Sequence, residues 1–179
     1  MHNMPRMKLN AEEKQYLEDL YHRYLNDEKI LQMKDIPMHR GSNCYIHSFR
    51  VARLAIKRAL RHKQVNLEAL LLACILHDYY LYNWRVDRSK KKGHGRNHPY
   101  IAAEQAERDF AIDMETKHAI QTHMWPLNFR AWPNSKEARI LSLADKHIAT
   151  LEFLTSSSYK KKREAKYLEE ISSLFGKNR

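Results

Sequence analysis

Glycine and proline are scarce in this sequence, with 4 glycines and 5 prolines among 179 residues. Together they make up about 5% of the chain, against roughly 12% in an average protein. A β-sandwich or β-barrel needs such residues at its many turns, so their scarcity argues against an all-β fold. Long helices joined by few connections fit better, and the length favours one domain with one sizeable core.

Cysteine is also scarce, since only Cys44 and Cys74 are present. This excludes a disulfide scaffold and a cysteine-rich zinc module, and it is typical of a reducing compartment. No stretch approaches the roughly 18 consecutive apolar residues that a membrane-spanning helix needs. The first residues also lack the apolar run of a signal peptide. We therefore expect a cytoplasmic protein without a membrane partner.

Acidic residues are absent from residues 36–63, a stretch that contains seven lysines and arginines. The chain has a formal net charge of +11, and basic residues also dominate residues 85–96 and 159–179. Such asymmetry is typical of proteins that bind anions, which here means a phosphorylated small molecule or a nucleic acid. Solvated helix faces that keep the protein soluble explain each basic stretch equally well.

Hydrophobic residues recur with the 3.6-residue period of helices almost everywhere, and the alternation typical of strands is absent. The pattern predicts an all-α fold of about seven or eight helices, with cap residues such as Asn10, Asn66 and Asp113 at helix starts. The helix over residues 66–76 is apolar on nearly every side and should be central and buried. The expected helices span residues 11–25, 27–33, 43–61, 66–76, 99–110, 113–123, 134–154 and 159–175.

Six side chains that can bind metals lie inside or near the ends of different predicted helices. Histidine and carboxylate ligands without thiolates suit Fe, Mn, Zn, Ni or Co, and they argue against a structural zinc site. An adjacent His-Asp pair converges on one metal most easily at a helix end, because neighbouring helical residues face about 100° apart. The six residues are His47, His77, Asp78, His98, His123 and Asp145.

The two aspartates of this set carry the physical argument for a metal. Asp78 closely follows the apolar run 69–76, and Asp145 lies in a helix whose neighbours Leu141 and Ile148 are expected in the core. Burying a carboxylate is costly unless it is paired or bound to a metal. Two carboxylates that face inward also repel each other unless a cation joins them. The surroundings of Asp78 and Asp145 therefore predict a buried cation.

The order His47, His77-Asp78 and Asp145 resembles the HD-domain superfamily of metal-dependent phosphohydrolases, which has an all-α fold. The apolar context also matches, because residues 44–52 and 71–78 are similar to the family's first-histidine helix and HD helix. The resemblance implies a metal-dependent hydrolase with one or two divalent metals per chain.

The resemblance covers about residues 40–155. The predicted helices within residues 9–35, and the basic helix over residues 159–175, are expected to pack on this core. We therefore expect residues 1–179 to form a single domain with an HD-like bundle at its centre. A homo-oligomer is compatible with the sequence.

The segments around His98 and His123 resemble those that supply a third and fourth histidine in dinuclear members of the superfamily, which cleave dinucleoside polyphosphates or cyclic dinucleotides. By this resemblance one metal is bound by His47, His77, Asp78 and Asp145. Asp78 is then the catalytic carboxylate that bridges to a second metal on His98 and His123. These residues all occur in the sequence.

Three features of the sequence leave parts of this assignment open. His94 competes with His98 as the third histidine, and a helix start at Pro99 favours His98. Leu81 stands where many members carry a lysine that contacts the substrate phosphate. The glycine-rich segment that follows the fourth histidine in cyclic-dinucleotide hydrolases is absent here.

A divalent cation lowers the pKa of bound water, so such a centre would present a bridging hydroxide that attacks phosphorus in a nucleotide or another small phosphorylated metabolite. Two alternatives remain. One is a mixed-valent di-iron oxygenase, a function that some proteins with an HD-like fold have, and the other is a non-catalytic nucleic-acid-binding module.

Substrate contacts are expected from cationic and aromatic side chains near the centre. These candidates are Arg50, Arg85, Lys92, Arg96 and Trp125.

Overall fold

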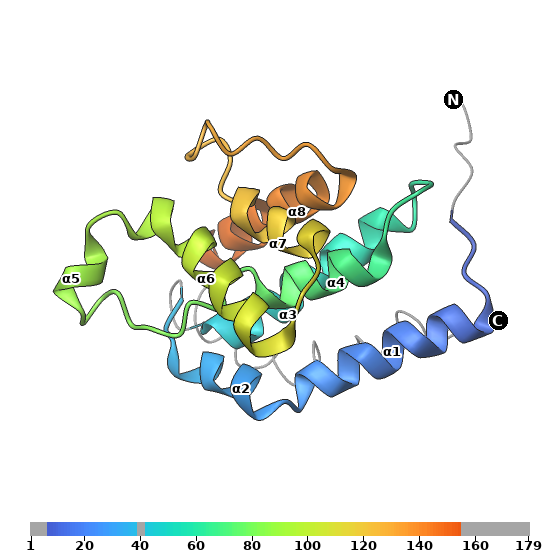
Figure 1. Cartoon of the computed structure of the whole chain (residues 1–179), viewed down its shortest axis with the longest axis horizontal. Coiled ribbons are helices and arrows are strands. Elements are labelled where there is room, and N and C mark those ends of the chain that lie inside the picture. The colour runs from blue at the N-terminus through green and yellow to red at the C-terminus, as the bar shows by residue number, and fades with distance from the viewer. Residues whose placement is uncertain (1–6, 39–41, 155–179) are drawn as a thin grey trace.

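The computed structural model describes residues 7–38 and 42–154 of the chain. Within these ranges it contains eight α-helices, one short 3-10 helix and no strand, which confirms the expected all-α bundle (Figure 1). The elements are α1 (Ala11–Leu25), α2 (Glu28–Leu31), η1 (Gln32–Asp35), α3 (Cys44–Ala59), α4 (Leu67–Leu76), α5 (Arg88–Lys91), α6 (His94–Phe110), α7 (Met114–Thr122) and α8 (Lys136–Leu154).

Capping side chains determine where several helices start, as the sequence predicts. Asn10 and Glu13 form a reciprocal capping box at the start of α1, with both hydrogen bonds 2.8 Å long. The side chains of Asn43, Asn66 and Asp113 each accept a hydrogen bond from the backbone of the first turn of α3, α4 and α7. Because these caps satisfy backbone donors that the helix cannot, they set the register of the helices that carry the candidate ligands.

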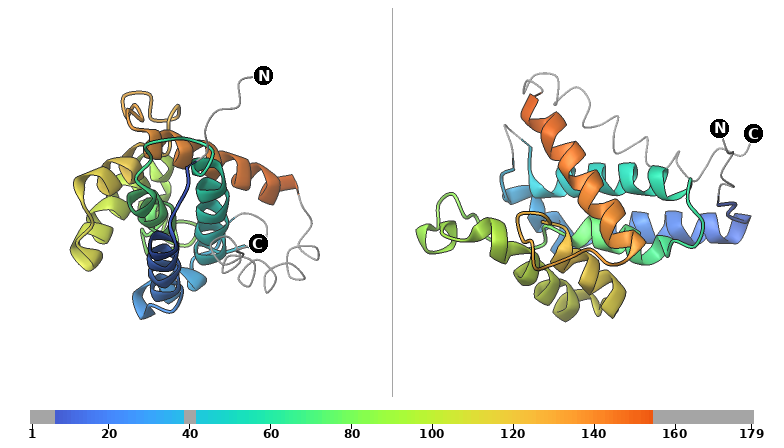
Figure 2. Two further views of the ribbon diagram at one scale, coloured as in Figure 1. Left: turned by 90° about the vertical axis from the view of Figure 1, so that its right-hand side faces the viewer. Right: turned by 90° about the horizontal axis from the view of Figure 1, so that it is seen from above.

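Helix α4 lies at the centre of the bundle, as its apolar sequence predicts. Eight of its ten residues are buried, and Glu68 and Leu72 are the exceptions. It packs against α1, α3, α7 and α8, and α6 packs mainly on α7 (Figure 1). Seen from above, α8 crosses over α3 and α4 (Figure 2). This crossing brings one end of the central helix close to residues contributed by four other helices.

The structure differs from the predicted elements in the segment before His98. Residues 88–91 form the short helix α5, and α6 begins at His94, so Pro99 lies inside the helix rather than in its first turn. A proline there removes only one backbone hydrogen bond, to the carbonyl of Gly95. Gly93 makes the earlier start possible, because it precedes α6 with φ +83°, a conformation that favours glycine.

Two further expectations have different outcomes. The predicted helix over residues 27–33 is divided into α2 and η1. The predicted basic helix over residues 159–175 lies outside the described residues, so its packing on the core stays a prediction. None of the described helices combines the length and hydropathy needed to cross a membrane.

Candidate metal centre

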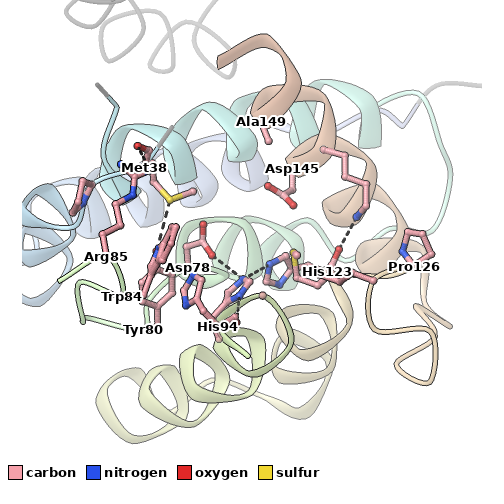
Figure 3. A pocket seen from close by; sticks show the side chains of 16 residues that line it. Met38, Asp78, Tyr80, Trp84, Arg85, His94, His123, Pro126, Asp145 and Ala149 are labelled. Carbon is pink, nitrogen blue, oxygen red and sulfur yellow. Dashed lines mark hydrogen bonds and ion pairs between the residues drawn. The ribbon is translucent and has the colours of Figure 1, made fainter. Parts of the chain in front are cut away.

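The structure brings all six candidate ligands to one buried place in the bundle. His47 lies in α3, His98 in α6 and Asp145 in α8, while His77-Asp78 and His123 directly follow the last residues of α4 and α7. Each side chain is buried. In Figure 3, Asp145 extends from α8 toward Asp78 and His123, on the opposite side of the pocket.

The distances between the ligand atoms define two overlapping groups. Nε2 of His47 lies 3.1 Å from Oδ1 of Asp145, and Nε2 of His77 lies 3.7 Å from the same oxygen. Oδ2 of Asp78 lies 3.4 Å from Nε2 of His77, whereas its Oδ1 lies 3.2 Å from Nε2 of His98. Asp78 therefore directs one oxygen to each group, which is the geometry that a bridging carboxylate requires.

Three histidines have their tautomer set by the backbone. Nδ1 of His77, His98 and His123 each lies 2.7–2.9 Å from a main-chain carbonyl oxygen three or four residues earlier. A carbonyl oxygen only accepts hydrogen bonds, so each Nδ1 carries the proton and donates it. Each Nε2 is left to face the other candidate ligands, as metal-binding histidines generally do.

These Nε2 atoms lie so close together that their lone pairs repel one another unless a positive charge lies between them. Nε2 of His98 lies 3.1 Å from Nε2 of His123, and two lone pairs at this distance repel unless a cation or a proton lies beside them. Nε2 of His77 is fully buried and has no hydrogen-bond partner, which is rare for a buried polar atom. The ligand atoms of His47, His77 and Asp145 lie within 4.8 Å of one another, as do those of His77, Asp78 and His123. A divalent metal fits both groups.

Glu152 is a functional residue that the sequence reasoning missed. Nδ1 of His47 donates to Oε2 of Glu152 over 3.0 Å, and Arg50 donates to Oε1 over 2.8 Å. Glu152 lies two helical turns after Asp145 on α8, so the seven-residue spacing was a signal that both face the same way. A carboxylate behind a histidine orients the ring and makes its other nitrogen a stronger ligand.

The charges around His47 favour its protonated form in the metal-free protein. Burial alone would lower the pKa of His47, but hydrogen bonds with Asp145 and Glu152 raise it to about 10. The pKa values of Asp78 and Asp145 lie below their usual range, because the neighbouring histidines outweigh the effect of burial. Both carboxylates are therefore ionised at neutral pH.

Metal binding is expected to release at least one proton per chain at pH 7–8, because a metal on Nε2 of His47 must displace the proton held there, and the raised pKa of His77 adds to this release. His123 releases no proton on metal binding, because its ring is already neutral: burial and the nearby His77 and His98 lower its pKa to about 3. A raised pKa means that the proton competes with the metal below about pH 10, so affinity should increase with pH. Titration calorimetry in buffers of different ionisation enthalpy measures the released protons. A binding heat that is independent of the buffer would contradict the role of His47.

The cluster opens into a cavity of about 610 Å³. Lys146 and His94 are two of the lining residues outside the candidate ligand set. Lys146 donates from Nζ to the carbonyl of His123 over 2.9 Å and to Oγ of Ser142 over 2.8 Å. His94 stacks on His98, with ring centroids 4.8 Å apart, and its Nδ1 lies 3.0 Å from the Tyr82 hydroxyl. His98 rather than His94 thus contacts the other candidate ligands.

The predicted substrate contacts are only partly supported. Arg85 lines the cavity, and it extends toward Met38 in Figure 3. Arg50 does not line the cavity, because its side chain is buried and pairs with Glu152, so its position does not support the expected phosphate contact.

The remaining candidates, Lys92, Arg96 and Trp125, lie outside the cavity lining. Lys92 and Arg96 are exposed to solvent. The Trp125 ring packs against Trp132 at a centroid distance of 4.8 Å. Their proposed substrate contacts therefore find no support in the position of these side chains.

Comparison with known proteins places this bundle in a family. No curated protein and no solved structure matches the chain. The family model described as HD domain matches residues 44–150, which is more than half of the chain and contains all six candidate ligands. The chain therefore belongs to the HD domain family.

Proposed function

We propose that the protein is a metal-dependent phosphohydrolase that cleaves a phosphoester or phosphoanhydride bond of a small phosphorylated metabolite. The observation that supports this most is the set of Nε2 atoms and two ionised carboxylates that converge beside a cavity, four of whose lining residues are candidate ligands. The HD domain family in general consists of metal-dependent phosphohydrolases. Nucleotides are one substrate class among the small phosphorylated compounds to be tested.

Each candidate ligand has a distinct task in this proposal. His47, His77 and Asp145 would hold one metal, and His98 and His123 a second, with Asp78 between them. A divalent metal bound there supplies an activated water and polarises the phosphoryl oxygens. The identity of the metal, among Fe, Mn, Zn, Ni and Co, is part of the proposal.

The cationic side chains around the cluster would orient the phosphate. Arg85 lies at the cavity wall and can bind phosphate oxygens in a bidentate manner. Lys146 already donates its hydrogens to His123 and Ser142, so it contributes positive charge rather than a direct bond. Burial lowers the pKa of Lys146, although the adjacent Asp145 opposes this effect.

The proposal is tested with protein that has been stripped of metal and reloaded with Mn, Fe, Co, Ni or Zn. We expect hydrolysis of phosphomonoesters, phosphodiesters or nucleotides with at least one of these metals, and its loss on addition of a chelator. Absence of turnover with every metal would contradict the proposal. Oxygen uptake by the ferrous-loaded protein, measured in parallel, would instead support the oxygenase alternative.

A further inference from the structure

The cavity wall beside the candidate metal centre is mostly apolar. Its apolar residues include Pro37, Met38, Trp84, Met124, Pro126 and Leu127. Figure 3 shows Met38 and Pro126 on opposite sides of the cluster. Among the described lining residues there is no asparagine, glutamine, serine, threonine or glutamate. The wall therefore offers hydrophobic contact and few hydrogen bonds.

The polar side chains that do line the wall are largely committed to contacts within the protein. The Tyr80 hydroxyl accepts from Sγ of Cys44 over 3.3 Å and faces the sulfur of Met38. Nδ1 of His94 is hydrogen-bonded to Tyr82, and Lys146 donates to three acceptors. Tyr80 and Lys146 therefore retain few hydrogen bonds for the edge of a base or a sugar hydroxyl.

Arg85 is the one described cation of the lining that can turn toward a phosphate. It donates one hydrogen bond, from Nη2 to the carbonyl of Met38 over 3.0 Å, and its guanidinium lies 5.2 Å from the Trp84 ring centroid. A guanidinium has five N–H donors, so it retains donors for an anion. A di- or triphosphate chain would need further cations, and Lys146, the other lysine or arginine of the described lining, already donates to His123 and Ser142.

We propose that the substrate carries a single phosphate on an apolar organic group, such as an alkyl chain or a plain aromatic ring, and is not a nucleotide. This inference rests on the proposed function. The phosphate is bound at the metal centre and by Arg85, and the apolar group lies against Met38, Met124 and Leu127. A site that is selective for nucleotides needs polar groups to recognise the base, and the described wall lacks them. The volume of about 610 Å³ accommodates a small organic molecule.

The test uses a series of linear alkylphosphonates, from methyl to octyl, as non-hydrolysable ligands of the metal-loaded full chain. Because each buried methylene contributes hydrophobic free energy, affinity should increase about fourfold per methylene until the cavity is filled. Calorimetry measures the affinities, with nucleoside monophosphates as comparison. Affinity that does not change with chain length, absence of phosphonate binding, or tighter binding of a nucleotide than of octylphosphonate would each overturn the inference.

A pair of variants on one loop localises the effect. Leu127 lines the cavity and is 50% exposed, whereas Phe129 is 72% exposed and lies outside the lining. Leu127→Asn should weaken octylphosphonate binding about tenfold and leave methylphosphonate binding unchanged. Phe129→Asn should change neither. Equal effects of the two variants would contradict the assignment of this wall.

Parallel hydrolysis assays with alkyl phosphates and nucleotides separate this inference from the proposed function. If phosphonates bind with the expected dependence on chain length but no phosphate ester is hydrolysed, the proposed function is wrong and the binding inference stands. If esters are hydrolysed with kcat/KM values that do not depend on chain length and are highest for nucleotides, the inference is wrong and the proposed function stands.

Discussion

Replacing Asp78 with asparagine is expected to lower the rate of phosphoester hydrolysis by about a thousandfold, which corresponds to ~4 kcal/mol of transition-state stabilisation. The substitution keeps the shape of the side chain but removes its negative charge. Asp78 is the one candidate ligand whose two oxygens face different histidines, His77 at 3.4 Å and His98 at 3.2 Å. Its loss should therefore affect both groups of ligands, and elemental analysis should show less bound metal per chain.

The matched control for this variant is Asp109→Asn. Asp109 also accepts a hydrogen bond from a buried residue, because the Tyr79 hydroxyl donates to it over 3.0 Å, but it lies outside the cluster. Arg108 lowers the pKa of Asp109, so this aspartate is ionised as well. We expect Asp109→Asn to keep its metal content and activity. An Asp78→Asn protein with full activity and full metal content would contradict the proposed centre.

Replacing Glu152 with glutamine is expected to weaken metal binding by about 10- to 100-fold, the usual effect of removing the carboxylate behind a histidine ligand. Glu152 accepts the Nδ1 hydrogen of His47 over 3.0 Å, and its charge makes the opposite nitrogen of the ring more basic. A glutamine fills the same space but supplies no charge. Competition with a fluorescent chelator measures the change in metal affinity. The thermal unfolding temperature of the metal-free protein should also fall, because buried Arg50 loses the charge of its partner.

Two further variants separate this positioning role from simple stabilisation. Glu137 is also a buried glutamate of α8, and it accepts a hydrogen bond from the backbone of Asn66 over 2.8 Å. Glu137→Gln should leave the metal affinity unchanged. Glu152→Ala removes the partner of both His47 and Arg50, and it should destabilise the fold by about 2–3 kcal/mol in addition to weakening metal binding. Equal metal affinities of Glu152→Gln and Glu137→Gln would show that Glu152 is only structural.

Much of the helix pattern could be predicted from local sequence, because capping and hydrophobic periodicity act over a few residues. Asn10, Asn66 and Asp113 cap helices as expected. The start of α6 could not be predicted in this way. Proline is common in the first turn of a helix, which favoured a start near Pro99, whereas the left-handed conformation of Gly93 allows the helix to begin at His94. The choice between these starts depends on packing beyond the segment.

Two of the candidate ligands could also be predicted from physical chemistry, because a carboxylate is unfavourable in apolar surroundings. Asp78 and Asp145 lie among apolar residues, where an ionised carboxylate is unfavourable without a cation. The positions of the substrate contacts could not be predicted in the same way. Arg50 carries the same charge as Arg85, yet Arg50 is buried against Glu152 and Arg85 lines the cavity.

The sequence alone determined the helical fold and its central apolar helix, through periodicity and caps, and it singled out Asp78 and Asp145 through the cost of buried charge. The histidines were candidates as metal-binding side chains at different helices, and the resemblance to the HD-domain superfamily gave them their roles. Only the tertiary structure decided which nitrogen of each histidine faces the cluster, which carboxylate lies behind His47, and that the cavity wall is apolar. His47 and Glu152 are 105 residues apart in the chain and meet only because α3 packs against α8. Contacts of this kind depend on the relative placement of whole helices, which no local pattern in the sequence specifies.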